Sequence, residues 1–186
     1  MKRTFISLLR AINVSGQNPI RMPELKTLYE KLGYQNVTTY LQSGNVVFDA
    51  LEQDDRQIAR SLEAAIASTF GMNVPVLIRS TPDLENILAS NPFASRANLD
   101  PARLVVVFLS AAPDELALSR LQPPPDIPDE FVLSEREIYL HCPNGLGRSK
   151  LTNSFFERKL GLVATSRNWN TVPALHAMAA QREKGD

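Results

Sequence analysis

The sequence predicts an α+β fold in which one small unit of four strands and two helices occurs twice. Short apolar runs of strand length alternate with longer segments whose apolar residues recur every three or four positions, the period of an amphipathic helix. In the first half these segments come in the order β-α-β-β-α-β, which is the split βαβ or ferredoxin-like pattern. The second half repeats this order without obvious sequence identity, so the predicted duplication depends on element order alone.

The first unit is predicted over residues 1–80. Its helices begin at Pro23, since proline at the first helical position loses no hydrogen bond, and near Ile58. They end at Gly33 and Gly71, because glycine tolerates the left-handed conformation that often follows a helix. The proline within the last strand favours an edge position. The four predicted strands are Phe5–Leu9, Val37–Leu41, Val46–Phe48 and Val74–Ile78.

A connecting helix, Thr81–Ala89, and a polar loop occupy residues 81–102, and a second, divergent unit follows over residues 103–186. In that unit, apolar spacing predicts one helix over Asp114–Leu121 and another that ends at Gly161. A C-terminal helix begins near Trp169. The predicted strands of the second unit are Leu104–Leu109, Phe131–Leu133, Ile138–His141 and Val163–Thr165.

Composition and charge place limits on the function. The 186 residues include 20 basic and 20 acidic side chains, and this balance disfavours a dedicated nonspecific nucleic-acid binder, which normally carries a basic excess. Charge is uneven along the chain, with six basic and two acidic residues in Met1–Lys31 against two basic and seven acidic in Ala111–Leu140. The single cysteine, Cys142, excludes an internal disulfide and fits a reducing compartment. With no apolar stretch near the roughly 20 residues of a membrane span, we expect a soluble cytoplasmic protein.

Two polar clusters in the first unit predict a binding site. They are Arg10–Gly16 and Gln42–Asn45, and each combines glycine with amide or hydroxyl side chains. A crossover helix makes the first two strands parallel, so the loop after one and the turn after the other should emerge at the same edge of the sheet. The alternative is ordinary turn chemistry. The candidate ligand-binding residues are Arg10, Asn13, Gly16, Gln42, Ser43, Gly44 and Asn45.

Two further candidates lie in the second unit. Asn144–Thr152 has two glycines and the cations Arg148 and Lys150 before a helix, and a helix start with free N–H groups favours an anion. In the alternative interpretation Ser149 simply caps the helix and the cations are solvated. The segment Arg167–Thr171 surrounds the only tryptophan, which we expect to be a core anchor rather than a stacking platform. The candidates here are Arg148, Ser149, Lys150, Thr152, Arg167 and Asn168.

Cofactor and metal chemistry find no support in the sequence. The G-x-x-x-x-G-K-[ST] spacing of a phosphate loop is absent, and the two histidines, His141 and His176, are too distant for a zinc motif. We therefore predict no cofactor and no metal. His141 is the one conventional general-base candidate, and its neighbour Cys142 should point to the opposite face of a strand.

Several motifs occur together in a recognisable order. They are LLRAINVSGQNPIRMPELKTLYEKLGYQNVTTYLQSGNVVF, RSKLTNSFFERKLG and ATSRNWNTV. With these motifs the chain resembles the bacterial family called domain of unknown function 1697 over nearly its whole length, most densely at Leu8–Phe48 and Arg148–Val172. The resemblance implies a two-part α+β architecture with ferredoxin-like character. It implies no activity, cofactor or catalytic residue.

The residues therefore indicate a binding module for a polar anionic ligand. A phosphorylated metabolite or nucleotide is favoured, and single-stranded RNA is a variant with weaker support. One alternative is an enzyme that uses the same Arg, Lys and Asn surface as a phosphate or oxyanion clamp. Another is a protein-interaction scaffold driven by the charge asymmetry. The sequence leaves open the oligomeric state and whether the two polar regions share a pocket.

Overall fold

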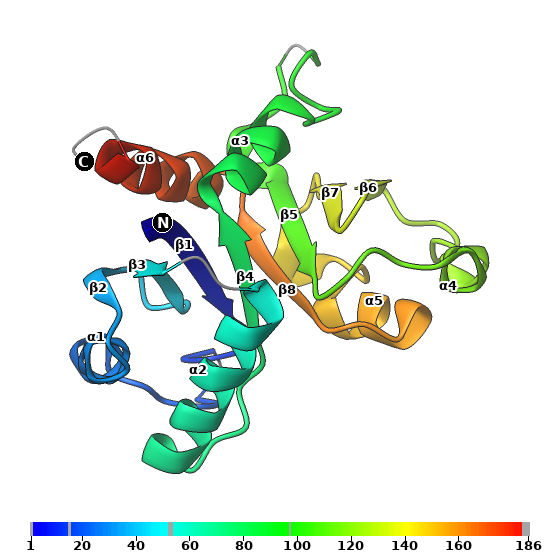
Figure 1. The fold of residues 1–186 in the computed structure, drawn as a ribbon. Helices are drawn as coiled ribbons and strands as arrows, with labels where there is room; N and C mark the ends of the chain where they lie inside the picture. The colour runs from blue at the N-terminus through cyan, green and yellow to red at the C-terminus, as the bar shows by residue number, and fades with distance from the viewer. Residues whose placement is uncertain (1, 15, 52–53, 97, 184–186) are drawn as a thin grey trace. The chain divides into compact units, whose positions relative to one another are not determined.

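The computed structural model describes residues 2–14, 16–51, 54–96 and 98–183 (Figure 1). The chain divides into two compact units. Unit 1 comprises residues 1–85 together with the segment from Ala174 onwards, and unit 2 comprises Asn86–Pro173. In this division the C-terminal segment groups with unit 1, whereas the sequence-based prediction assigned it to the second unit, residues 103–186.

Unit 1 contains one four-stranded sheet in the order β2-β3-β1-β4, with every neighbouring pair antiparallel. Because β1 and β2 both run antiparallel to β3, they are parallel to each other, and their carboxyl ends lie at the same edge. β4 lies at the edge of the sheet as predicted, although Pro75 directly precedes this strand rather than lying within it. The elements are β1 (Lys2–Leu9), α1 (Met22–Lys31), β2 (Gln35–Tyr40), β3 (Asn45–Leu51), α2 (Asp55–Phe70) and β4 (Val76–Ser80).

Helices α1 and α2 cover one face of this sheet and form the core of unit 1 with it. Asp54 caps α2 by accepting a hydrogen bond from the Arg56 N–H, and Gly71 ends that helix in the left-handed conformation. Within the core the Tyr29 hydroxyl is hydrogen-bonded to Ser7 at 2.8 Å, so this buried polar group has a partner. Residues that build the core include Phe5, Leu25, Tyr29, Phe48, Ile58, Leu62 and Ile66.

The opposite face of the unit 1 sheet carries a buried carboxylate. Asp49 alternates with the core residue Phe48 along β3 and therefore points away from α1 and α2. Its carboxylate accepts hydrogen bonds from Thr4 (2.9 Å) and Asn36 (2.6 Å) and lies 3.3 Å from the Lys2 ammonium. Arg182, in the last turn of α6 (Thr171–Glu183), pairs with it at 3.8 Å. This ion pair, together with the hydrogen bond that Arg182 donates to the Thr38 hydroxyl at 2.7 Å, joins the C-terminal segment to unit 1.

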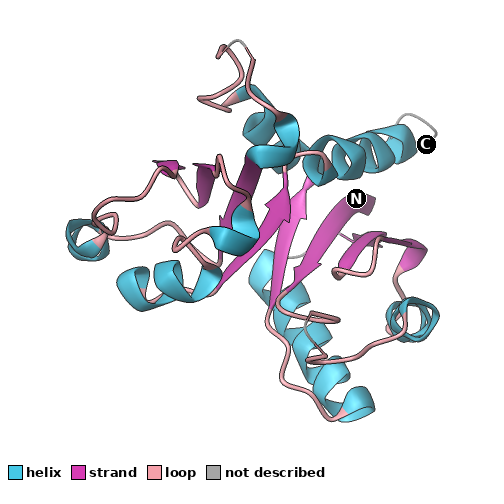
Figure 2. Ribbon diagram, turned by 180° about the vertical axis from the view of Figure 1, so that it is seen from behind, coloured by secondary structure: helices cyan, strands magenta, loops and turns pink. Residues whose placement is uncertain are grey.

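Unit 2 contains a second four-stranded antiparallel sheet in the order β6-β7-β5-β8 (Figure 2, strands in magenta). Strand β5 pairs with β7 on one side and with β8 on the other. In the register, Leu104 lies opposite His141 on β7 and Val105 lies opposite Asn168 on β8. The connecting helix α3 (Thr81–Ala89) crosses the unit boundary, as the division after Glu85 shows. The elements are the 3-10 turn η1 (Pro101–Arg103), β5 (Leu104–Leu109), α4 (Glu115–Arg120), β6 (Glu130–Ser134), β7 (Glu137–His141), the 3-10 turn η2 (Leu146–Arg148), α5 (Asn153–Leu160) and β8 (Ala164–Asn168).

Helices α4 and α5 share a core with one face of the unit 2 sheet. Asp114 caps α4 by accepting from the Ala117 N–H, and Gly161 ends α5 in the left-handed conformation. Phe156 lies edge-on to both Phe155 and Phe131, an arrangement that favours aromatic pairs. The core includes Val105, Val107, Leu109, Ile138, Leu140, Leu151, Phe155, Phe156 and Leu160.

The predicted α+β fold class is therefore confirmed. Within the described residues it has two four-stranded antiparallel sheets and six α-helices. The predicted bounds of Thr81–Ala89 and Leu104–Leu109 match α3 and β5, and the other elements differ at their ends by a few residues. None of the described helices has the length and hydropathy of a membrane span.

Candidate functional site

The two polar clusters of unit 1 meet at one edge of the sheet, as the parallel arrangement of β1 and β2 predicts. The Leu9 N–H donates to the Gly44 carbonyl at 2.8 Å. The Asn13 side-chain amide donates to the Gln42 carbonyl at 2.9 Å. The predicted proximity of these segments is therefore confirmed.

Asn13 uses its amide to fix the loop after β1. Besides its bond to Gln42, its Nδ2 donates to the Ile20 carbonyl, and its Oδ1 accepts from the Ile20 N–H, both at 2.9 Å. Its φ of 53° is one that asparagine tolerates better than most residues. The amide of Asn13 therefore closes a loop, and its donors have partners within the protein.

The turn after β2 is equally well packed. Asn45 is fully buried, and its Nδ2 donates to the Tyr40 carbonyl (2.8 Å) and to the Ser43 hydroxyl (3.0 Å). Gly44 has a φ of 81°, and a Cβ added there would lie 2.8 Å from atoms of Leu9 and Ile12. Only glycine fits this position, since both the conformation and the space exclude a side chain.

Few groups at this edge remain available to a ligand. Gln42 and Gly16 are exposed, Ser43 is half-buried, and half-buried Arg10 donates its backbone N–H to the Pro75 carbonyl at 2.9 Å. The role of these residues in ligand binding stays a prediction. The geometry favours the alternative stated for them, in which the amides and glycines form the turns themselves.

In unit 2, the hydroxyls of the segment after β7 also have structural partners. The Ser149 hydroxyl donates to Asp129 at 2.9 Å and accepts from the Leu151 N–H at 3.0 Å. Thr152, rather than Ser149, caps α5 by accepting from the Phe155 N–H. Arg148 and Lys150 are exposed, and no carboxylate in the described part of the chain pairs with either of them.

A third cation lies beside this segment. Arg103 comes directly before β5, and a Cβ added to Gly145 would lie 2.8 Å from its guanidinium nitrogen. Arg103 is about half exposed and lies 3.9 Å from Asp100. Because Gly145 begins the short turn that ends at Arg148, the two arginines lie at the same edge of the unit 2 sheet. Sequence reasoning missed Arg103, which stands alone in a segment without a motif.

The end of β8 completes this edge. The Asn168 amide donates to the Ala102 carbonyl at 3.0 Å, and its oxygen accepts from the Asn170 N–H. We call the surface formed by Arg103, Gly145, Arg148, Lys150 and Asn168 the basic rim. It unites parts of both polar clusters that were predicted for this half of the chain.

Arg167 lies inside the protein rather than on the basic rim. Its guanidinium donates to the Thr165 hydroxyl and the Ser166 carbonyl, both at 2.8 Å, and burial lowers its pKa to about 10. Trp169 is half-buried, and its backbone N–H donates to Leu104. These contacts favour a structural role for Arg167, and the role of the Trp169 ring as a core anchor stays a prediction.

His141 lies beside the ion pair of Arg96 and Glu130. Its Nδ1 lies 3.5 Å from Oε1 of Glu130. Arg96 donates to both carboxylate oxygens of Glu130, to Oε1 at 3.0 Å and to Oε2 at 2.9 Å. These contacts, chiefly that of Arg96, hold the pKa of Glu130 below its usual value. The Arg96 guanidinium lies 4.7 Å from the centre of the Phe93 ring. A carboxylate and an aromatic ring thus hold Arg96 beside the imidazole.

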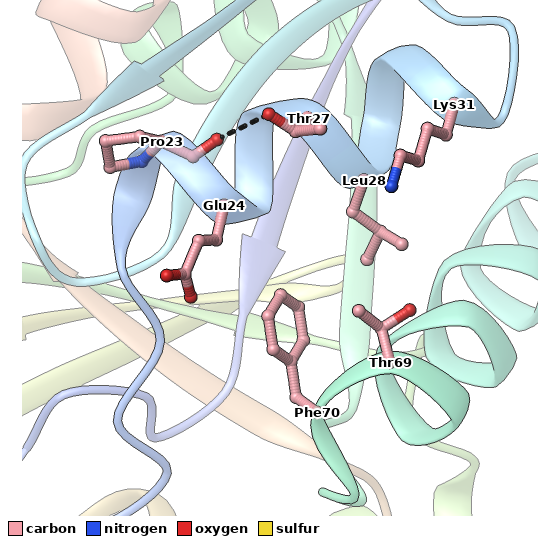
Figure 3. A pocket seen from close by; sticks show the side chains of 7 residues that line it. All are labelled: Pro23, Glu24, Thr27, Leu28, Lys31, Thr69 and Phe70. Atoms are coloured by element: carbon pink, nitrogen blue, oxygen red, sulfur yellow. Dashed lines mark hydrogen bonds between the residues drawn. The ribbon is translucent and has the colours of Figure 1, made fainter.

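Two hollows occur in unit 1 away from the predicted residues. A groove of about 500 Å³ lies between α1 and the last turn of α2, and its sides include Leu28 and Phe70 (Figure 3). A smaller polar cavity of about 260 Å³ adjoins Lys2 and Asp49. Among the described residues, no group of three His, Cys, Asp or Glu side chains has metal-binding geometry.

Comparisons with known proteins agree with this fold. A solved structure of the conserved bacterial protein SP0830 from Streptococcus pneumoniae matches with a TM-score of 0.72 at 22% sequence identity, covering 96% of this chain and 99% of that chain. At this identity the match shows the fold alone. No curated protein matches. Residues 1–139 match the family described as Protein of unknown function (DUF1697), and since this is well over half of the sequence, the chain belongs to that family.

Proposed function

We propose that the protein is a binding module for a small anionic ligand, a phosphorylated metabolite or a nucleotide, which is taken by the basic rim of unit 2. The observation that carries this proposal is the position of Arg103 against Gly145, which places an arginine 45 positions before Arg148 at the same sheet edge. Guanidinium groups bind phosphate through two parallel hydrogen bonds, and an ammonium adds a point charge.

The free cations support this assignment better than the hydroxyls do. Arg148 and Lys150 have no acidic partner among the described residues, whereas Ser149 and Thr152 are engaged by Asp129 and by the helix start. Asp100 and Asp129 lie close to the basic rim and reduce its net charge. The rim therefore suits one small anion better than a long nucleic-acid backbone, for which single-stranded RNA is the weaker variant.

Thermal unfolding in the presence of adenosine monophosphate tests this proposal. A ligand that binds only the folded state, present at 100 times its Kd, stabilises by about 2.7 kcal/mol. For a chain of this length, that corresponds to a rise in Tm of about 5–10 °C. Adenosine, which lacks the phosphate, should give no shift.

A double variant, Arg148→Ala with Lys150→Ala, should abolish the shift without lowering the basal Tm, since both side chains are exposed. The matched control is Arg120→Ala, which removes an exposed cation from α4 of the same unit. An equal shift in the double variant, or no shift with adenosine monophosphate or inorganic phosphate, contradicts the proposal. Binding of a single-stranded oligoribonucleotide alone would favour the RNA variant instead.

We also propose that the two units are divergent copies of one ferredoxin-like unit. The order β1-α1-β2-β3-α2-β4 with sheet order β2-β3-β1-β4 corresponds step by step to β5-α4-β6-β7-α5-β8 with sheet order β6-β7-β5-β8. An experimental structure with a different strand order in one unit would disprove this. A cytoplasmic location, proposed from the single buried Cys142, is tested by cell fractionation.

A further inference from the structure

The groove between α1 and α2 has an apolar middle. Leu28 reaches into it from α1 and Phe70 from the last turn of α2, and both side chains also contact the core of unit 1 (Figure 3). Contacts with the core fix the position of these side chains. A volume of about 500 Å³ is within the range of small-molecule sites.

The two ends of the groove carry opposite charges. Glu24 and Lys31 line it seven residues apart on α1, which at 1.5 Å per residue separates their backbones by about 10 Å. The Lys31 ammonium has no carboxylate partner within the described residues. Figure 3 shows the Lys31 side chain directed into the groove, on the side of Leu28 that is away from Glu24.

Glu24 is loosely paired outside the groove. The guanidinium of Arg21 lies 3.7 Å from the carboxylate, and both side chains are more than half exposed. Exposed pairs of this kind contribute little, so the carboxylate is free to accept a second cation. The groove therefore offers a carboxylate, an apolar wall and an ammonium in that order along α1.

We propose that this groove binds a short apolar peptide of about three residues with both ends free, its ammonium at Glu24 and its carboxylate at Lys31. An extended chain spans about 3.3–3.6 Å per residue, so three residues match the separation of about 10 Å between the backbones of Glu24 and Lys31 along α1. The apolar side chains of the peptide lie against Leu28 and Phe70. This site is in unit 1 and is independent of the basic rim of unit 2.

An NMR titration of the whole protein with the tripeptide Ala-Leu-Ala tests the inference. Amide signals of α1 and of the last turn of α2 should shift with the free peptide. The same peptide with an acetylated amino end and an amidated carboxyl end should bind more weakly. Lys31→Gln should weaken binding of the free peptide by about twofold to fivefold, the value of an exposed ion pair, and should leave the blocked peptide unaffected.

The control variant is Lys26→Gln on the same helix, which alters a lysine that pairs with Glu30 and does not line the groove. This variant should bind the free and the blocked peptide as strongly as the wild type does. The inference is overturned if millimolar free peptide shifts no groove signal, or if free and blocked peptides bind equally. It is also overturned if Lys31→Gln weakens both peptides alike.

Discussion

Replacement of Asp49 by asparagine tests how strongly the buried carboxylate stabilises unit 1. The side chain is 4% exposed and receives hydrogen bonds from Thr4 and Asn36, with Lys2 at 3.3 Å and Arg182 at 3.8 Å. Asparagine preserves the shape. It removes the charge, however, and replaces one acceptor oxygen with an NH2 group that faces donors.

The expected loss of stability combines the loss of the charge with the loss of one hydrogen-bond acceptor. Loss of one partner from a buried ion pair costs about 3–5 kcal/mol when both charges are fully desolvated. Here Lys2 is 34% exposed and can be rehydrated, whereas Arg182 is largely buried, and burial already lowers its pKa. We therefore expect Asp49→Asn to lower the free energy of unfolding by about 2–4 kcal/mol at pH 7.

The stability that the Asp49 carboxylate contributes falls as the pH falls. Burial alone would raise the pKa of Asp49, but hydrogen bonds from Asn36, Thr4 and Lys2, with the Lys2 charge, hold it below its ordinary value. A depressed pKa in the folded state gives stability that is fully present above the unfolded pKa of about 3.9. This stability is lost as the pH falls through the lower pKa of the folded state. The variant, which has no carboxylate here, lacks this dependence.

Urea unfolding of both proteins between pH 7 and pH 3, followed by circular dichroism, measures the difference. The gap between wild type and variant should be widest near neutral pH and should narrow below about pH 4. A combination with Arg182→Met should show coupling, because Arg182 loses its partner in the single variant. A change below about 0.5 kcal/mol at pH 7, or a gap that does not vary with pH, would refute this account.

Three further predictions concern local features. Gly44→Ala should lower the free energy of unfolding by about 2–4 kcal/mol, because the added methyl group overlaps Leu9 and Ile12. Gly33→Ala has a similar φ of 87° but open space around it and should cost about 1–2 kcal/mol, so equal losses in urea unfolding would contradict the prediction. Thr152→Ala should cost about 1 kcal/mol through loss of the α5 cap, while Thr152→Ser should keep it, and thermal unfolding distinguishes them. Burial raises the pKa of Cys142, so its thiol should react with an aromatic disulfide reagent far more slowly in the folded than in the unfolded protein, and comparable rates would falsify the assignment.

Local signals were sufficient to predict the elements and their order. Proline and glycine mark helix ends at Pro23 and Gly71, and continuous apolar runs such as Leu104–Leu109 mark buried strands. Since strand order follows from element order once the crossovers are assigned, the meeting of Asn13 with Gln42 was also predictable.

The use of the polar side chains was not predictable. The sequence does not distinguish an amide that binds a ligand from one that closes a loop, and Asn13 and Asn45 do the latter. Arg103 is recognised only once the strand ends are placed together, because no local pattern surrounds it. The groove at Phe70 arises from helix packing and has no signature in either helix alone.

The division of the chain has a consequence for its synthesis. Unit 1 is discontinuous in sequence, so the segment that supplies Arg182 is made only after all of unit 2 has been synthesised. At 5–20 residues per second, the roughly 100 intervening residues delay that event by about 5–20 s. Throughout this interval Asp49 lacks its arginine partner, so the set of contacts to its carboxylate is completed only once Arg182 has been made and has left the ribosome.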